Sequence, residues 1–244
     1  MKTDEKVYRF LEWDTKFFGF GIVQLCAPTH GEEELRIILR DLKKEGVKLV
    51  YWASDPSDEA SQQAARALKG LLVDKKITYN IDLRANRPEP PAFPAAIREY
   101  SSIHSSEDLD RLVIECGKYS RFNIDPQFKG SQYEKLYKTW FQKSLTKELA
   151  DIVLVAEQND VISGMITARH KNDEGWIGLL AVDDRMQGKN IGMNLVHAAN
   201  NWFISNNCTH AKVVTQGENG PACRLYEKCG YHPERKDYFF HFWI

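Results

Sequence analysis

Residues 183–192 bring charged, amide and glycine residues together directly after an apolar run, Trp176 to Val182. The run has the length and composition of a buried strand. After the loop, apolar residues recur at helical spacing and predict a helix over about residues 188–203. A loop at a helix N-terminus gathers unpaired backbone amides, and together with the helix dipole they can hold an anion. The sequence therefore indicates an anion site here, to which Lys189 adds a positive charge.

Two glycines in a strand, loop and helix do not by themselves distinguish a phosphate site from an ordinary connection. The pattern Gln187-x-x-Asn190-x-Gly192 resembles the (Gln/Arg)-x-x-Gly-x-(Gly/Ala) signature of the GNAT acetyltransferase superfamily. Asn190 replaces the family's glycine, but Asn tolerates a left-handed backbone better than other side chains, so we expect the loop to keep its shape. The resemblance implies acetyl-CoA as co-substrate, with its pyrophosphate on the loop residues Gln187, Gly188, Lys189, Asn190, Ile191 and Gly192.

A second pattern, from Asn219 to Tyr231, resembles the other GNAT signature, Asn-x-x-Ala-x-x-(Leu/Arg)-Tyr-Glu-Lys-x-Gly-(Phe/Tyr). It also has the features of a helix, because Asn219 can cap its start and Gly230 its end. The resemblance implies that Tyr226 protonates the departing thiolate of CoA and that Asn219 belongs to the cofactor site. Tyr226 also lies on an apolar stripe, so a purely structural tyrosine is the alternative.

The resemblance implies direct transfer of acetyl to an amine, without an acyl-enzyme intermediate or a metal. In this family the strand before the loop separates from its neighbour, which assigns oxyanion and cofactor contacts to the backbone at Leu180, Ala181 and Val182. The base that takes the amine's proton is not identifiable. Glu157, His170 and Asp183 lie near predicted strand ends, and we interpret each as an ordinary solvent-exposed residue.

Three segments resemble a narrower branch of the family, the dTDP-fucosamine acetyltransferases and their relatives, which act on nucleotide-linked amino sugars. They are Trp13-Asp-x-x-Phe-Phe-Gly, Val73 to Tyr79, and Ser-Arg121-Phe122. This resemblance implies substrate contacts by Phe17, Arg121 and Phe122, with Arg121 pairing with a phosphate in its forked geometry. A hydrophobic plug at residues 13–19 and a surface arginine beside a core phenylalanine are the alternatives.

Several functions fit these patterns. The first is an N-acetyltransferase for a nucleotide-linked, dTDP-bound amino-deoxy sugar. A GNAT enzyme acting on a protein N-terminus, a polyamine or an antibiotic amine is the second. The third is a non-catalytic module that binds acyl-CoA.

The order of expected elements predicts an α/β (α+β) protein with the GNAT fold, a central mixed, mostly antiparallel sheet flanked by helices. We expect a smaller N-terminal α/β domain over 1–83, a proline-rich linker over 84–95 and a GNAT domain over 96–244. Strands are predicted at 20–26, 47–53, 77–83, 97–100, 152–157, 161–169, 176–182, 211–215, 231–235 and 238–244. Helices are predicted at 32–45, 57–69, 107–116, 131–145, 188–203 and 219–230, with a loop at 119–126.

The 244 residues carry 33 Lys and Arg against 34 Asp and Glu, a net charge of -1. Such a balance gives no general field for nucleic acid or an anionic membrane, so neither is expected as a partner. The resemblance implies a small-molecule substrate, and a homodimer is left open. The N-terminal residues lack the apolar segment of a signal peptide. Five cysteines, an odd number without metal-ligand spacing, are typical of reduced thiols, so we expect a cytoplasmic protein.

Overall fold

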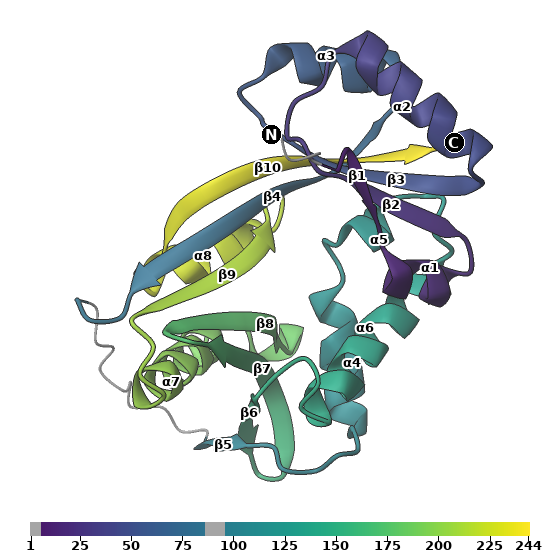
Figure 1. Cartoon of the computed structure of the whole chain (residues 1–244). Coiled ribbons are helices and arrows are strands. Elements are labelled where there is room, and N and C mark those ends of the chain that lie inside the picture. The colour runs from purple at the N-terminus through teal and green to yellow at the C-terminus, as the bar shows by residue number, and fades with distance from the viewer. Residues whose placement is uncertain (1–5, 86–95) are drawn as a thin grey trace. The chain divides into compact units, whose positions relative to one another are not determined.

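The computed structural model describes residues 6–85 and 96–244, which form two compact units (Figure 1). Unit 1 comprises Met1–Lys76 and Lys236–Ile244, and unit 2 comprises Ile77–Arg235. The chain passes between the units within β4 and within β10. The domain limits predicted at residues 83 and 96 stay a prediction, and residues 86–95 of the predicted linker lie outside the described residues.

Unit 1 is a small α/β layer. Its β1 is antiparallel to β2, β2 is parallel to β3, and β3 is antiparallel to β10. Leucines of the helix α2 pack against the inner residues of β3, including Trp52, because they repeat at helical spacing on one face. The elements are β1 (Tyr8–Phe10), α1 (Glu12–Phe18), β2 (Gly21–Leu25), α2 (Glu32–Lys44), β3 (Val47–Ser54), α3 (Glu59–Ala67) and β4 (Leu71–Asp82).

The aromatic segment at residues 13–19 is a helix, α1, which the sequence did not indicate. Trp13 and Phe17 are four residues apart, and their rings stack at a centroid distance of 5.1 Å on one side of this helix. Gly19 ends the helix with a φ of 80°, a left-handed conformation that glycine adopts without strain. The other predicted elements of unit 1 are confirmed, except that residues 71–82 form one continuous strand.

Unit 2 contains a mixed, mostly antiparallel sheet. From one edge inward, β5, β6, β7 and β8 pair antiparallel, β8 then pairs parallel with β9, and β4 lies next to β9. The predicted α/β class and the mixed sheet are therefore confirmed. The strands are β5 (Ala96–Glu99), β6 (Ile152–Gln158), β7 (Val161–Lys171), β8 (Glu174–Val182), β9 (His210–Gln216) and β10 (His232–Trp243).

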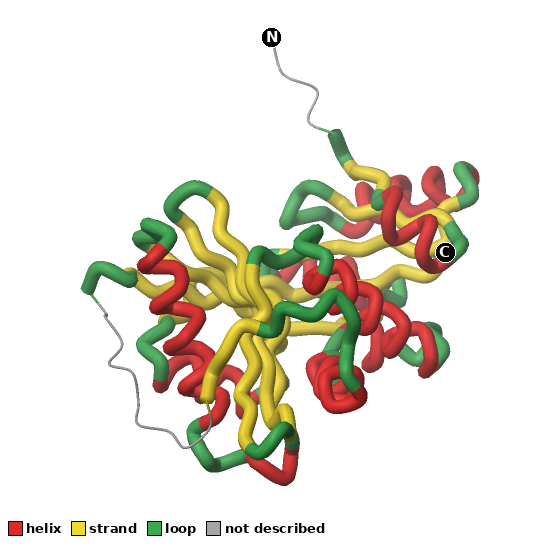
Figure 2. The backbone as a smooth tube through the Cα atoms, turned by 90° about the horizontal axis from the view of Figure 1, so that it is seen from below, coloured by secondary structure: helices red, strands yellow, loops and turns green. Residues whose placement is uncertain are grey.

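Helices cover both faces of these strands (Figure 2). Side chains alternate along β6, so that Leu154 faces the helix α7 and Val155 faces α4 and α6. Each face has a separate apolar core, and together the cores fix the two helical layers against the sheet. The helices are α4 (Glu107–Cys116), α5 (Arg121–Ile124), α6 (Gly130–Leu145), the 3₁₀ turn η1 (Asp184–Met186), α7 (Ile191–Ser205) and α8 (Gly220–Lys228).

Three predictions in unit 2 and its exit strand need correction. The loop predicted at 119–126 contains the short helix α5, capped by Ser120, whose hydroxyl accepts from the amide of Phe122. The helix predicted from about residue 188 begins at Ile191. Residues 232–243 form one strand, β10, rather than two. The first five residues of this strand are exposed, so the polar residues Lys236 and Asp237 continue it and do not mark a turn.

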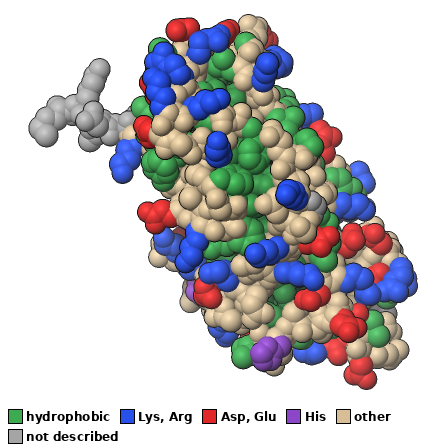
Figure 3. All heavy atoms as spheres, turned by 90° about the vertical axis from the view of Figure 1, so that its right-hand side faces the viewer, with side chains coloured by type: hydrophobic (Ala, Val, Ile, Leu, Met, Phe, Trp, Pro, Cys, Tyr) green, Lys and Arg blue, Asp and Glu red, His purple; other side chains and the backbone are tan. Residues whose placement is uncertain are grey.

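The described part of the chain contains no helix of the length and apolar character that crossing a membrane requires. Basic and acidic side chains are interspersed on the face shown in Figure 3, which agrees with the near-zero net charge.

Candidate functional site

The strands β8 and β9 separate halfway along β8. Their pairing runs from Glu174 opposite His210 to Ile177 opposite Val213 and then stops, although both strands continue. The separation predicted for this strand is therefore present. It leaves the edge of β8 at residues 179–182 without a partner strand on the β9 side.

A bulge in the neighbouring pair orients this edge. The register of β7 against β8 shifts between Ile166 and Ala168, and the hydroxyl of Thr167 accepts the amide of Leu179 at 2.8 Å. Because successive amides of a strand point to opposite sides, the amides of Leu180 and Val182 face the opening, as an oxyanion donor requires.

The loop after β8 presents a run of free amides. Gly188 and Asn190 have φ values of 77° and 61°, so Asn190 adopts the left-handed backbone that the sequence predicts for it. Within the described residues, the backbone amides of 188–193 donate no hydrogen bond to the protein. They cluster at the start of α7, where the helix dipole favours an anion. These amides are the strongest local indication of a phosphate site.

A pocket of about 700 Å³ opens between the separated end of β8 and this loop. It collects most of the predicted cofactor residues. Lys189 is not part of the lining, and its amine lies 3.4 Å from the sulfur of Met186. The predicted residues that line the pocket are Leu180, Ala181, Val182, Gln187, Gly188, Asn190, Ile191, Gly192 and Asn219.

Two of these residues also have structural partners. The side-chain oxygen of Asn219 accepts the amide of Ala222 and caps α8, as the sequence predicts. Gly192 lies close to α8, because a Cβ at this position would come within 3.1 Å of the Leu225 side chain. A side chain at position 192 would therefore require Leu225 of α8 to shift by a few tenths of an ångström.

Tyr226 is buried, 4 % exposed, and does not belong to the lining. Its ring packs against those of Tyr79 and Tyr231, each at a centroid distance of 6.0 Å. Burial raises its pKa well above the ordinary value, and nearby Cys116 contributes to that rise. Cys116 does line the pocket, so a pocket residue lies near the predicted acid.

Asp183 is not solvent-exposed, and that prediction is wrong. It is 7 % exposed and accepts hydrogen bonds from Arg185 at 2.7 Å and from Arg111 at 2.9 Å. The hydrogen bond from Arg185 holds the pKa of its carboxyl well below the ordinary value, although burial acts in the opposite direction. Asp183 therefore fixes the start of the loop to α4.

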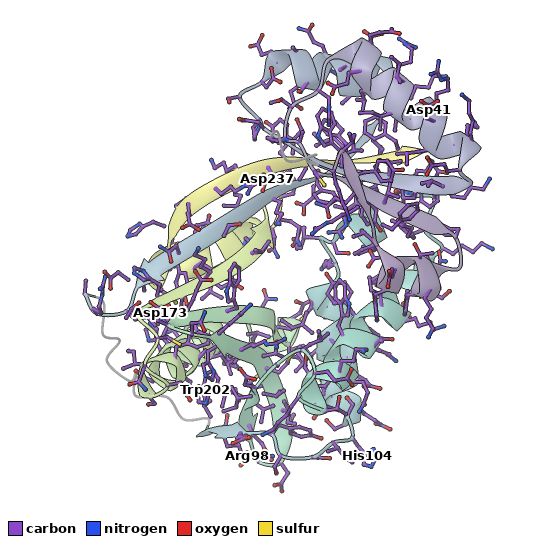
Figure 4. The ribbon with its side chains drawn as sticks, in the orientation of Figure 1. Asp41, Arg98, His104, Asp173, Trp202 and Asp237 are labelled. Atoms are coloured by element: carbon purple, nitrogen blue, oxygen red, sulfur yellow. The ribbon has the colours of Figure 1, made fainter. Side chains whose placement is uncertain are left out.

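The other two residues near strand ends are partly exposed and paired. Glu157 forms an ion pair with Arg98 on the neighbouring strand β5. Figure 4 labels Arg98 on that strand. His170 lies 3.2 Å from the carboxylate of Asp151 and packs edge-on against Trp202. Neither belongs to the pocket lining.

The predicted acceptor residues lie outside this pocket. The guanidinium of Arg121 lies 4.4 Å from the ring centre of Phe122. Phe122 is 3 % exposed and contacts the rings of Phe128 and Trp140. Phe17 belongs to unit 1 and stacks on Trp13.

The sequence did not indicate that the end of α4 reaches the pocket. Glu115, Cys116, Lys118 and Tyr119 all line it, and Cys116 contacts the backbone of Leu180. Only the apolar face of α4 could be predicted, since contacts with a distant strand leave no periodic pattern. Among the described residues, no group of three or more His, Cys, Asp or Glu is arranged to hold a metal.

Comparisons with known proteins agree with this geometry. Residues 119–231 match the model of the acetyltransferase (GNAT) family. The spore coat polysaccharide biosynthesis protein SpsD of Bacillus subtilis is 29% identical over 57% of this chain and 47% of its own length. Streptothricin acetyltransferase of Escherichia coli is 35% identical over 25% of this chain and 34% of its own length. The chain thus spans about half the length of SpsD and about a third of the length of streptothricin acetyltransferase.

Solved structures identify the fold. A GCN5-related N-acetyltransferase from Sphaerobacter thermophilus superimposes with a TM-score of 0.62 at 16% identity, over 97% of this chain and 76% of its own. The likeness shows that the chain has the GNAT fold, as predicted. Residues 119–231 are thus similar to the GNAT family, and the chain as a whole has the GNAT fold.

Proposed function

We propose that this protein is an N-acetyltransferase that moves acetyl from acetyl-CoA directly to an amine. The observation that carries the proposal is the run of unbonded amides at 188–193, at the same pocket as the open edge of β8. A diphosphate suits the first feature and a thioester carbonyl suits the second. Because both are parts of acetyl-CoA, one bound molecule accounts for both features.

The chemistry follows from this placement. The amine nitrogen attacks the thioester carbonyl, and the negative charge that develops on oxygen is stabilised by the amides of Leu180 and Val182. The carbon–sulfur bond then breaks, the thiolate of CoA receives a proton, and the nitrogen loses one. Holding both reactants in one pocket supplies much of the rate, because the encounter becomes effectively intramolecular.

Tyr226 is the group we propose for the leaving thiolate. Its raised pKa keeps the phenol protonated at neutral pH, so it can donate a hydrogen bond to the sulfur. A phenol is a weaker acid than a thiol, whose ordinary pKa is about 8.5. Tyr226 therefore stabilises the thiolate by hydrogen bonding until a proton is supplied.

For the acceptor we propose the amino group of a nucleotide-linked, dTDP-bound amino-deoxy sugar. The Bacillus subtilis relative SpsD is named as a protein of spore coat polysaccharide biosynthesis, which agrees with a sugar acceptor. We propose that Arg121 binds a phosphate of the nucleotide. The ring of Phe122 packs against the guanidinium of Arg121.

A second acceptor class is an antibiotic amine. Streptothricin acetyltransferase, which matches 60 residues of this chain, supports it. The two classes differ in charge, since a nucleotide-linked sugar carries phosphates. A test of which acceptor the protein acetylates therefore distinguishes the two classes.

The test is to incubate the purified protein with acetyl-CoA and a panel of amines, and to measure released CoA thiol and acetylated product. The panel contains dTDP-linked amino sugars, streptothricin, a polyamine and a peptide with a free N-terminus. Product only with the dTDP-linked sugars supports the sugar acceptor, and product with streptothricin supports the second class. Binding of acetyl-CoA without product on any amine would mean a non-catalytic module and would refute the enzyme.

A further inference from the structure

Glu115 is a carboxylate that lines the pocket without a partner in the protein. Among the described residues, its side chain takes part in no ion pair and no hydrogen bond. Asp184, the other acidic residue of the lining, accepts the side-chain amide of Gln187. Glu115 is thus the only acidic residue of the described lining whose carboxylate is unengaged.

The position of Glu115 on its helix is unfavourable for stability. It is the second-last residue of α4, and the last turn of this helix contains no basic residue. A negative charge at a helix C-terminus interacts unfavourably with the helix dipole. A structural role therefore does not explain the carboxylate, whereas a cationic ligand in the pocket would.

Glu115 also lies near the reacting end of the pocket. Its chain neighbour Cys116 contacts the backbone of Leu180, which is one of the two proposed oxyanion donors. Glu115, Cys116 and Leu180 all line the same pocket. The basic residues of the lining, Lys118, Arg224 and Lys228, suit phosphates and cannot accept a proton from an ammonium ion.

We propose that Glu115 binds the amino group of the acceptor and is the base that takes its proton. This inference rests on the proposed acetyl transfer. When the neutral amine adds to the carbonyl, the nitrogen of the tetrahedral intermediate carries a positive charge. Glu115 accepts one proton from that nitrogen, the carbon–sulfur bond breaks, and water carries the proton from the carboxyl of Glu115 to the thiolate of CoA. One amide and one thiol are formed, so atoms and charge balance.

The experiment compares Glu115→Gln, Glu115→Asp and Glu115→Ala with Glu134→Gln as a matched control. Glu134 and Glu115 both raise the pKa of Tyr133, but Glu134 lies outside the pocket lining. With acetyl-CoA and a dTDP-linked amino sugar, we expect Glu115→Gln to lower kcat about 100-fold or more. Glu134→Gln should keep the wild-type kcat.

Further measurements separate a base from a structural residue. In Glu115→Gln, acetyl-CoA binding measured by calorimetry should not change, and the melting temperature should stay the same or rise slightly, because the unfavourable charge at the helix end is removed. Glu115→Asp should keep part of the activity, and added formate should restore part of the activity of Glu115→Ala, because the small carboxylate can enter the space. A kcat of Glu115→Gln within threefold of wild type overturns the proposal, as does loss of acetyl-CoA binding or failure of formate to restore activity.

The wild-type protein serves as the reference for the proposed function. If it acetylates no amine of the panel, acetyl transfer itself is refuted and the role of Glu115 is refuted with it. If the wild type is active and Glu115→Gln is equally active, only the role of Glu115 is refuted.

Discussion

The thiol of Cys116 lies against the backbone of Leu180, where β8 no longer pairs with β9. Removal from solvent raises the pKa of this thiol to about 12, and the contact with Leu180 offsets the rise only in part. The side chain is therefore a neutral thiol at neutral pH, although it lines the pocket. It is suited to filling space at the acyl end and not to nucleophilic attack.

The state of this thiol can be measured by alkylation. Since the thiolate is the reactive species, we expect iodoacetamide at pH 8 to modify exposed Cys26 at least about 10-fold faster than Cys116. Raising the pH towards 10 should speed the reaction at Cys116, and saturating acetyl-CoA should slow it. Peptide mass spectrometry over time gives both rates, and equal rates at pH 8 would contradict the assignment.

Tyr226→Phe tests the proposed donor to the leaving sulfur. The ring and its contacts with Tyr79 and Tyr231 are kept, so we expect an unchanged melting temperature and acetyl-CoA KM, with kcat lower by about 100-fold. Tyr231→Phe is the control, because its hydroxyl donates to Asn200 at 2.6 Å, away from the pocket. This control should lose about 1 kcal/mol of stability and keep kcat. An unchanged kcat in Tyr226→Phe removes the tyrosine from the mechanism.

Asp183 should make stability depend on pH. Its folded-state pKa is depressed, chiefly by the hydrogen bond from Arg185, so the ionised carboxylate stabilises the fold above the unfolded value of about 4. This contribution is lost as the pH falls through the folded-state pKa. Asp183→Asn should cost about 1–3 kcal/mol at pH 7, and the difference from wild type should shrink between pH 4 and 2. Urea unfolding at several pH values measures it, and a pH-independent difference would contradict the role of charge.

The parts of the site that follow from local sequence could be predicted. The anion loop and the two following helices are marked by residues whose preferences act over a few positions, such as Asn190 in the left-handed region and Asn219 at a helix cap. The separation of β8 from β9 came from family resemblance. These features need no knowledge of distant contacts.

The parts that depend on packing could not be predicted. Asp183 follows an apolar strand and was interpreted as exposed, but Arg111 on α4 reaches it from 72 positions away in the chain. Glu115 looks like any polar residue on a helix surface, and only the packing of α4 beside β8 brings it to the pocket. Long-range contacts of this kind have no periodic signature in a single sequence.

The backbone of Asn190 decides whether the loop can hold a diphosphate. Its φ of 61° is left-handed, a conformation that costs a β-branched side chain about 1–2 kcal/mol and glycine almost nothing. Asn190→Gly should therefore keep the melting temperature and acetyl-CoA affinity, while Asn190→Val should lower both, because relief of strain turns the amides of 188–193 away from one another. Calorimetric titration of each variant with acetyl-CoA and with free CoA measures the change in affinity. Both ligands should lose affinity alike, since they share the diphosphate. Full affinity in Asn190→Val would mean that side chains, and not these amides, hold the coenzyme.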